Sequence, residues 1–510
     1  MMKNPILCLA SVVMPLFCAA LLSSCQKEDV QVSVREDVVI DIPDFTGGPD
    51  DVLVSATLVD TKSVAEAVQN ATKSFSETGL VLDEFAALAG DDAPSLMSGF
   101  DNIVYLVQNI VDLTEVKEFL HDLDIETDIE LRTYRINYKS KGGVNGAEDV
   151  ILSADVSYLA DKQNRFKRHL ESVSLFSVGY GTAYMDISTL NDLVAPARAA
   201  HNALAVFPHC QGMVADAGAH LVAPAEFLQK SRQTIDAEIA ALQLVKLLDD
   251  VTMMSQYYTE NIGESNGGGV SLGVHYLLEN DPDYKKVNEE YIHLAATYID
   301  EGNLSYTTTF PGLMNTPDSP DGLTFPLTPN GLMPSMYLAN VVSSIYSHPE
   351  MFVTEDKTYV EEDYFKEDFL SLGFYGRQWI PYFKTGTMSM AMMAFFYKGG
   401  MTGIVKEDVL DETGNIDVNN PAIKCLMDVY ALNDVMLGGW SPKKPVKFAH
   451  STIDEFVNFD DVKAVAENLT KGAPGWNVKV STNSFFGHFT SVYYWLFLDI
   501  MLKKHPCPLV

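Results

Sequence analysis

Apolar and polar residues alternate along two neighbouring stretches of the chain, residues 128–139 and 149–159. Alternation with a period of two is typical of a strand that buries one face, as Ile129 and Leu131 do in the first stretch. The loop Gly-Gly-Val-Asn-Gly at residues 142–146 separates the two stretches. The pattern therefore predicts an antiparallel pair of strands joined by a glycine-rich loop.

Downstream of this pair, short apolar runs alternate with segments of helical period. Strands are expected at residues 173–178, 204–207, 257–262 and 291–298, with helices at about 223–249 and directly after residue 265. The same rhythm returns near the C-terminus, with strands at 445–450 and 476–482 and helices at 459–470 and 487–504. Strands separated by helices in this way assemble into a mainly parallel sheet with helices on both faces. We therefore predict an α/β architecture.

Two regions depart from this rhythm. Residues 30–60 alternate only in places, which suggests short strands or an extended segment, whereas residues 61–124 repeat every 3.6 positions and predict three or four helices. Residues 303–335 are rich in Thr, Pro, Gly and Asn, and residues 336–438 indicate helices with loops. An insertion of about 140 residues therefore interrupts the sheet, far more than an ordinary connection.

The first 25 residues have the pattern of a targeting segment. Lys3 precedes an apolar run over residues 6–22, and Leu-Ser-Ser-Cys at residues 22–25 closes it. This ending resembles the lipobox of bacterial lipoproteins, in which the cysteine is acylated and the chain is cut just before it. The resemblance implies that Cys25 anchors an exported protein to a membrane, facing the periplasm or the cell surface. An ordinary secretory signal or a membrane helix is the alternative.

Composition restricts the possible partners. A hydrophobic content of 47% over 510 residues is ample for a buried core. The 35 Lys and Arg residues stand against 69 Asp and Glu residues. Nucleic acids and anionic lipid surfaces both attract clustered positive charge, so this balance argues against either as a partner. The sequence leaves the oligomeric state open.

Cysteine spacing indicates neither a disulfide framework nor a metal site. The six cysteines are Cys8, Cys18, Cys25, Cys210, Cys425 and Cys507. The first two leave with the signal segment and the third carries the lipid, so three remain, an odd number at wide separation. His209 and His220 lie near Cys210, but no second cluster with ligand spacing accompanies them. We expect no metal and no organic cofactor.

The most informative stretch for chemistry is residues 257–278. A strand-like run leads into Gly-Glu-Ser-Asn-Gly at residues 263–267, and a helix with an almost side-chain-free first turn follows. In this setting Gly-x-Ser-x-Gly is typical of a nucleophile elbow, in which glycines let strand and helix pass without Cβ clashes. We expect Ser265 to have a strained backbone and to lie at the positive end of the helix. The alternative is a tight turn with an unreactive serine.

A nucleophilic serine needs a base, and the base needs an acid that fixes its tautomer. Asp454 lies in the loop after the strand expected at 445–450, and His488 follows the strand expected at 476–482. We predict that these residues are the acid and the base. Their rivals are His275 and His450 for the base, and Glu455, Asp460 and Asp461 for the acid.

The order Ser265, Asp454, His488 is the order of the α/β-hydrolase fold. From about residue 128 to the C-terminus, the chain resembles an α/β hydrolase of the bacterial esterase and secretory-lipase-like kind. The resemblance depends on the elbow, Ala-Leu-Asn at 431–433, Gly-Trp-Ser-Pro at 439–442, His-Ser-x-x-Asp-x-x-Val at 450–457 and Gly-His at 487–488. It implies that Ser265 is the nucleophile, Asp454 the acid and His488 the general base.

By the same resemblance, an oxyanion hole is formed by two backbone N–H groups. One belongs to Asn266, and the other belongs to the loop at residues 177–182, where Thr182 is the best candidate. Tyr180 stands where relatives often carry histidine, and His-Cys-Gln-Gly-Met-Val at 209–214 replaces their Asp-Tyr-x-Gly-x-Gly. These two departures leave the substrate contacts open.

These observations divide the chain into five parts. They are a lipoprotein signal peptide at 1–24, a tether and N-terminal helical region at 25–127, the first part of the α/β-hydrolase core at 128–300, a largely helical cap insertion at 301–440, and the second part of the core at 441–510. The insertion falls where such enzymes place a cap over the site. Its methionine-rich run at 388–397 either lines an acyl pocket or forms a buried cap helix.

The sequence therefore predicts a serine hydrolase that cleaves carboxylic esters through an acyl-enzyme, similar to esterases and lipases. The substrate is expected to be a small-molecule or lipid ester, with its acyl and alcohol groups left open. Two alternatives remain. One is a non-catalytic protein on the same fold that binds a lipid or glycan, which the unusual oxyanion loop would favour. The other is a serine peptidase.

Overall fold

The structure is a computed structural model. It describes residues 39–40, 52–63, 66–67, 70, 129–179, 194–195, 198–199, 202–211, 226–305, 340–370, 405–412, 416–435, 439–454, 457–472, 474–484, 488 and 491. Several predicted features lie outside these residues: the lipid anchor at Cys25, most of the N-terminal helical region, the oxyanion candidate Thr182, and the methionine-rich run at 388–397.

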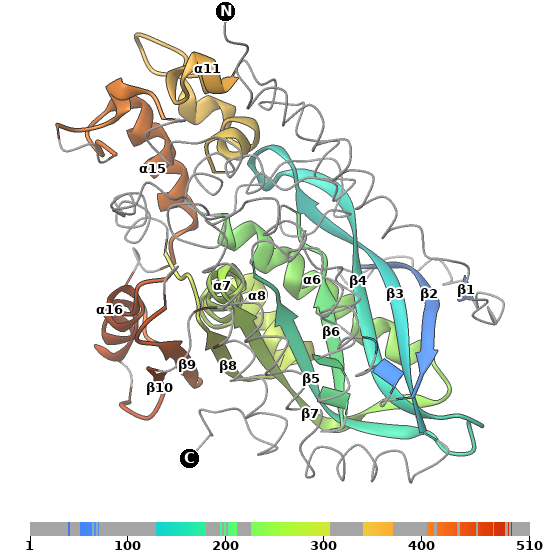
Figure 1. Cartoon of the computed structure of the whole chain (residues 1–510). Helices are drawn as coiled ribbons and strands as arrows, with labels where there is room; N and C mark the ends of the chain where they lie inside the picture. The colour runs from blue at the N-terminus through green and yellow to red at the C-terminus, as the bar shows by residue number, and fades with distance from the viewer. Residues whose placement is uncertain are drawn as a thin grey trace, which may run out of the picture.

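Ten strands form one sheet in the order β1-β2-β3-β4-β6-β5-β7-β8-β9-β10 (Figure 1). They are β1 (Val39–Ile40), β2 (Leu53–Lys62), β3 (Ile129–Gly142), β4 (Glu148–Asp161), β5 (Arg168–Ser177), β6 (Ala203–Pro208), β7 (Val251–Glu264), β8 (Leu294–Asp300), β9 (Val446–Ser451) and β10 (Val478–Asn483). Pairs from β1 to β6 are antiparallel, and pairs from β6 to β10 are parallel. Only β2 and β4 therefore run against the other strands of this sheet, which confirms the mainly parallel architecture.

The predicted antiparallel pair is β3 with β4, whose register runs without a break from Ile129 opposite Asp161 to Gly142 opposite Glu148. The short 3-10 turn η2 (Val144–Gly146) joins the two strands. Gly143 and Gly146 have φ values of 64° and 61°. Glycine adopts this left-handed backbone without a Cβ clash, so the glycine-rich loop can close the hairpin tightly.

Helices cover both faces of the sheet, and the alternation along β6 shows it. Leu204 and Val206 pack into a core cluster with α6 (Phe227–Leu247) and α7 (Asn266–Asn280). Ala205 and Phe207 point the other way, into a second cluster that contains the helical residues Val194, Ala195 and Ala199. Successive side chains of a strand point to opposite faces, so β6 is buried from both sides.

Helix α16 (Phe459–Thr470) has the bounds that the sequence predicts. Asn458 caps its first turn, where its side-chain oxygen accepts a hydrogen bond from the Asp460 N–H group at 3.0 Å. Asp460 and Asp461 add negative charge at this positive end. The helix packs against β9 and β10. Asp460 and Asp461, two of the three rivals of Asp454, therefore belong to the start of this helix.

The chain between β8 and β9 makes the long insertion. Its described part contains helical residues 340–347, η5 (Pro349–Phe352), η6 (Glu361–Asp363), α11 (Glu367–Leu370), η8 (Glu407–Val409) and α15 (Pro421–Asn433). All of these elements except η6 contribute residues to one core cluster with α7 and β9. Near the two ends of the insertion, the Ser305 hydroxyl donates a hydrogen bond to the Asp434 carboxylate. The insertion is thus packed onto the sheet domain, and its role as a cap stays a prediction.

The sheet also extends upstream of residue 128. Strand β2 pairs with β3 from Leu53 to Lys62, with register shifts at two places, and Leu53 and Ala56 are buried in the core. The register shifts disturb the alternation that would otherwise mark this strand in the sequence. Among the described residues, no helix is long and apolar enough to span a membrane.

A buried ionic cluster ties β3 to the start of β7. The Arg132 guanidinium donates to the Glu130 carboxylate at 2.8 Å and to the Asp250 carboxylate at 2.5 Å. The Tyr158 hydroxyl donates to the same Asp250 oxygen at 2.9 Å. All three charged side chains are less than 10% exposed. Each charge in the cluster thus depends on its partners because water does not reach it.

We expect Arg132→Met to lower the free energy of unfolding by about 3 kcal/mol, because two buried carboxylates lose their cation. Urea denaturation followed by circular dichroism measures this change. Lys141→Met is the matched control, because it removes an ion pair with Asp149 whose side chains are 56% and 91% exposed. That variant should unfold at nearly the same urea concentration as the unaltered protein. Equal losses in the two variants would contradict the assignment.

Candidate active site

Ser265 lies between the last residue of β7 and the first residue of α7. Its backbone has φ 50° and ψ −124°, a conformation that residues with a Cβ rarely adopt. Neighbouring backbone holds it there. The Ser265 N–H donates to the Asp300 carbonyl, and the Ser265 carbonyl accepts from the N–H groups of Gly268 and Asn303, each at 2.9 Å. The serine therefore has the strained geometry expected of a nucleophile elbow.

Close backbone contacts explain the two glycines of the motif. A Cβ added at Gly267 would lie 2.1 Å from the Ser177 carbonyl oxygen, and one added at Gly263 would lie 2.3 Å from the Gly267 carbonyl oxygen. Real Cβ atoms do not approach oxygen so closely. Only glycine at these two positions lets β5, β7 and α7 meet around Ser265.

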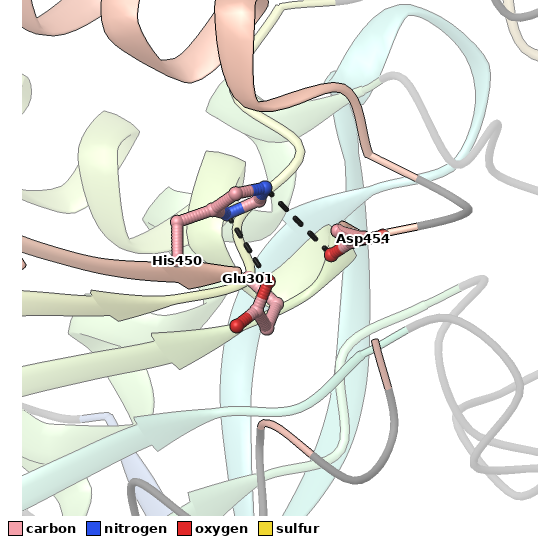
Figure 2. A group of neighbouring side chains, drawn as sticks. All are labelled: Glu301, His450 and Asp454. Atoms are coloured by element: carbon pink, nitrogen blue, oxygen red, sulfur yellow. Dashed lines mark ion pairs between the residues drawn. The ribbon is translucent and has the colours of Figure 1, made fainter. Parts of the chain in front are cut away.

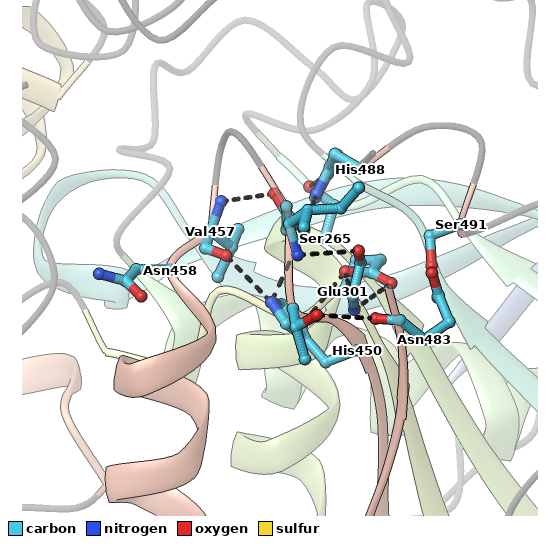
Figure 3. Close-up of polar contacts among 12 residues, drawn as sticks. Ser265, Glu301, His450, Val457, Asn458, Asn483, His488 and Ser491 are labelled. Carbon is cyan, nitrogen blue, oxygen red and sulfur yellow. Dashed lines mark hydrogen bonds and ion pairs between the residues drawn. The ribbon is translucent and has the colours of Figure 1, made fainter. Parts of the chain in front are cut away.

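His488, which lies beside Ser265 in Figure 3, links this serine to Asp454. Its Nε2 atom lies 3.0 Å from the Ser265 Oγ atom, and its Nδ1 atom lies 2.6 Å from the Asp454 Oδ2 atom. This network assigns the proton to Nδ1, which donates to the carboxylate, and leaves Nε2 to accept from the serine hydroxyl. His488 is 3% exposed, and the Asp454 side chain is fully buried. The three predicted residues therefore meet in space in the order that proton transfer requires.

The strand ends bring these residues together. Ser265 follows β7, Asp454 follows β9, and His488 follows β10. These strands are parallel, so their carboxyl ends lie along one edge of the sheet. A span of 223 positions between Ser265 and His488 thereby closes to hydrogen-bond distance.

The rival histidines are engaged elsewhere. The Nδ1 atom of His275 lies 2.8 Å from the Thr297 Oγ1 atom, and its Nε2 atom lies 3.2 Å from Glu279. His450 donates from Nε2 to the Val457 carbonyl at 3.0 Å, and its Nε2 atom is 3.7 Å from Asp454. His275 is therefore part of the packing under α7, whereas His450 lies behind the acid.

Charge at Asp454 is maintained despite burial. Burial favours the neutral carboxyl, but the charge and hydrogen bond of His488, followed by contributions from Glu301 and His450, outweigh it. Together they hold the pKa of Asp454 well below its usual range. The group is thus ionised at neutral pH and able to orient the imidazole.

The loop after β5 starts directly beside the serine. The Gly179 N–H group donates to the Glu264 Oε1 atom at 3.1 Å, and a Cβ on Gly179 would lie 3.0 Å from the Ser265 Cβ atom. Burial raises the pKa of Glu264, against the opposing effects of this N–H group and of His488. Glu264, the first variable position of Gly-x-Ser-x-Gly, thus holds the loop in place. The motif alone does not show this role. Asn266, the predicted oxyanion donor on the other side, is the first residue of α7 and is buried.

Sequence reasoning also missed a second carboxyl group behind the acid (Figure 2). Glu301, His450 and Asp454 place ligand-type atoms within 4.8 Å of one another, a spacing that would suit a metal ion. These atoms already have protein partners. The Ser451 N–H donates to both Glu301 oxygens, His450 donates to Val457, and Asp454 accepts from His488. Hydrogen bonding within the protein therefore accounts for the cluster. The available signal was the position of Glu301 close after the strand expected at 291–298.

The segment at His209 and Cys210 is built differently. Ser153 lies 2.8 Å from the His209 Nδ1 atom, and the Cys210 thiol contacts the Thr234 hydroxyl at 3.3 Å. Both residues are buried. Burial raises the pKa of the Cys210 thiol to about 11, so the thiol is protonated and packs as a small apolar group.

No protein-family model matches the chain, and no curated protein sequence matches it. Solved structures do match. One is a candidate hydrolase from Legionella pneumophila, with a TM-score of 0.55 and 13% identity over 89% of this chain and 97% of that protein. Another is the rice cell wall degrading esterase LipA from Xanthomonas oryzae, with a TM-score of 0.52 and 15% identity over 75% of this chain and 90% of that protein.

The strand order, the strained serine and these structural neighbours decide the fold. This chain has the α/β-hydrolase fold. In an α/β hydrolase the nucleophile, acid and histidine follow different strands of one sheet in that chain order. Ser265, Asp454 and His488 occupy those three positions.

We expect Gly267→Ala to destabilise the protein by about 3 kcal/mol or to prevent its folding, because the new methyl group overlaps the β5 backbone. Thermal denaturation and the yield of soluble protein measure the effect. Gly475→Ala is the matched control, because no heavy atom lies within 4 Å of a Cβ at that position. If both variants melt together with the unaltered protein, the close contact at Gly267 does not exist.

Proposed function

We propose that the protein is a serine hydrolase that cleaves carboxylic esters through an acyl-enzyme. The observation that carries this proposal is the position of His488, 3.0 Å from the Ser265 hydroxyl and 2.6 Å from the Asp454 carboxylate. The structural neighbours support it as well, because LipA is described as a cell wall degrading esterase. An ordered Ser-His-Asp network favours catalysis over passive binding on the same fold.

The proposed reaction has two halves, acylation and deacylation, and Ser265, His488 and Asp454 take part in both. The Ser265 Oγ atom attacks the ester carbonyl while His488 Nε2 takes its proton, and His488 then gives that proton to the leaving alcohol. Asp454 holds the Nδ1–H group and stabilises the imidazolium that forms. In the second half, water attacks the acyl-enzyme with His488 as the base, and the carboxylic acid product is released.

The oxyanion donors are proposed from the backbone around the serine. Asn266 begins α7, so its N–H group lies at the positive end of that helix. The Gly179 N–H group is bound to Glu264, which favours a second donor further along the same loop, as Thr182 would provide. Two such donors stabilise the negative oxygen of the tetrahedral intermediate.

The proposed substrate is a small-molecule or lipid ester, with no organic cofactor or metal taking part. The lipobox-like segment ending at Cys25 further supports an exported enzyme held to a bacterial membrane by lipid. Such an anchor would keep the site near membrane or envelope esters.

A fluorophosphonate probe tests the proposed nucleophile. The unaltered protein should be labelled, and Ser265→Ala should not be. On p-nitrophenyl esters of several acyl lengths, Ser265→Ala and His488→Ala should lose roughly 10⁶-fold in kcat, because members of such a network act as a unit. His169→Ala is the control, because His169 is exposed on β5 and should keep full activity.

Matched amide substrates separate an esterase from a peptidase. Faster cleavage of the esters, with little amide cleavage, would agree with the proposal. Folded protein that neither reacts with the probe nor hydrolyses any ester of the panel would refute it, and would favour a binding protein on the same fold.

A further inference from the structure

Glu301 lies beneath the proposed acid, where no charged residue was expected. It is the first residue after β8, it is fully buried, and its backbone has φ 50°. Its N–H group donates to the Ala449 carbonyl at 2.9 Å. A strained, buried glutamate costs stability, so its presence at a strand end beside the site points to a specific role.

Three groups surround the Glu301 carboxyl group. The Ser451 N–H donates to its two oxygens at 2.9 and 3.0 Å. The Asp454 carboxylate lies on one side, with an oxygen within 4.8 Å of a Glu301 oxygen. The His450 Nδ1 atom lies 3.3 Å from its Oε2 atom on another side (Figure 2). The carboxyl group thus joins the acid loop to β9.

The hydrogen-bond inventory places a proton on Glu301. His450 donates from Nε2 to the Val457 carbonyl, and burial lowers the pKa of His450. The imidazole is therefore neutral, and its Nδ1 atom is an acceptor. Asp454 is ionised and is an acceptor too. A hydrogen bond between Glu301 and either acceptor therefore requires a hydrogen on Glu301, whose single O–H group can donate to one of them.

We propose that Glu301 is a positioning residue that acts as a neutral acid, donating a hydrogen bond to the Asp454 carboxylate and so fixing the oxygen that receives the His488 Nδ1–H group. This proposal rests on the proposed serine hydrolase function. Figure 3 shows Glu301 in the same polar network as Ser265, His450 and His488. The neutral form supplies a hydrogen bond without adding a second negative charge next to Asp454.

The arrangement makes the network sensitive to alkaline pH. Burial, and then the hydrogen bond and charge of Asp454, raise the pKa of Glu301 to about 9. Below that pH the proton is present. Above it, two carboxylates face each other, the hydrogen bond is lost, and Asp454 no longer holds His488 in place. The titratable groups that face Glu301 are Asp454 on the acid loop, His450 on β9 and His488 after β10.

The pH profile of kcat/KM tests this role. The unaltered enzyme should lose activity above about pH 9. E301Q should lack this alkaline loss, because the amide donates to Asp454 and does not titrate. E301A should lose on the order of 100-fold in kcat across the pH range with little change in KM, because Asp454 loses its support. E301Q should retain clearly more activity than E301A. If the enzyme instead required a negative charge at this position, both variants would lose activity equally.

E238Q is the matched control for the charge and burial of the substitution. Glu238 is a fully buried residue of α6 that accepts a hydrogen bond from the Thr259 hydroxyl, and burial raises its pKa to about 8. E238Q should keep both the activity and the alkaline loss. If E301Q keeps the alkaline loss, or shifts the acidic midpoint as removal of a negative charge beside His488 would, the proposal is wrong.

An infrared difference spectrum tests the proton without any substrate. The spectrum of the unaltered protein minus that of E301Q at pH 7 should contain the C=O stretch of a protonated carboxylic acid, and the band should vanish above about pH 9. If this band appears but the fluorophosphonate probe does not react, the hydrolase function fails while the protonated Glu301 stands. If the probe reacts and the band is missing, the hydrolase stands and the role of Glu301 fails.

Discussion

The close contact between the first turn of α7 and the backbone of β5 governs the whole site. Gly267 and Ser177 approach so closely that a single methyl group would separate strand from helix. Next to this contact Ser265 has a strained backbone, and hydrogen bonds with Asp300 and Asn303 hold it there. Ser265 therefore stands at a fixed point on the edge of the sheet, and the other two side chains reach it from neighbouring strands.

Three neighbouring carboxyl groups at this edge of the sheet, those of Asp454, Glu301 and Glu264, differ in whether they carry a proton. Asp454 is ionised because His488 faces it, whereas burial and the neighbouring charge favour a protonated Glu301. Glu264 uses its carboxyl group to hold the Gly179 backbone. Similar side chains thus have different protonation and different roles because their hydrogen-bond partners differ.

Local patterns in the sequence predicted much of this architecture. Alternation gave the hairpin of β3 and β4, helical period gave α16, and the glycines of the elbow followed from backbone contact, so the fold class is confirmed. The position of β6 between β4 and β5 could not be predicted, because periodicity does not determine which strands are neighbours. The position of Glu301 beside the acid loop was equally hidden, because its hydrogen-bond donor Ser451, at the end of β9, lies 150 positions away in the sequence. The catalytic roles of Ser265, Asp454 and His488 stay predictions.

The tie between Ser305 and Asp434 has an evolutionary consequence. It holds together the two ends of the long segment between β8 and β9, a module whose described elements also pack against α7 and β9. Insertions, deletions or exchanges inside such a module change loop-closure entropy only slowly with length. Descendants of this gene can therefore vary the module, and with it the surface next to the site, without displacing the residues anchored on the strands.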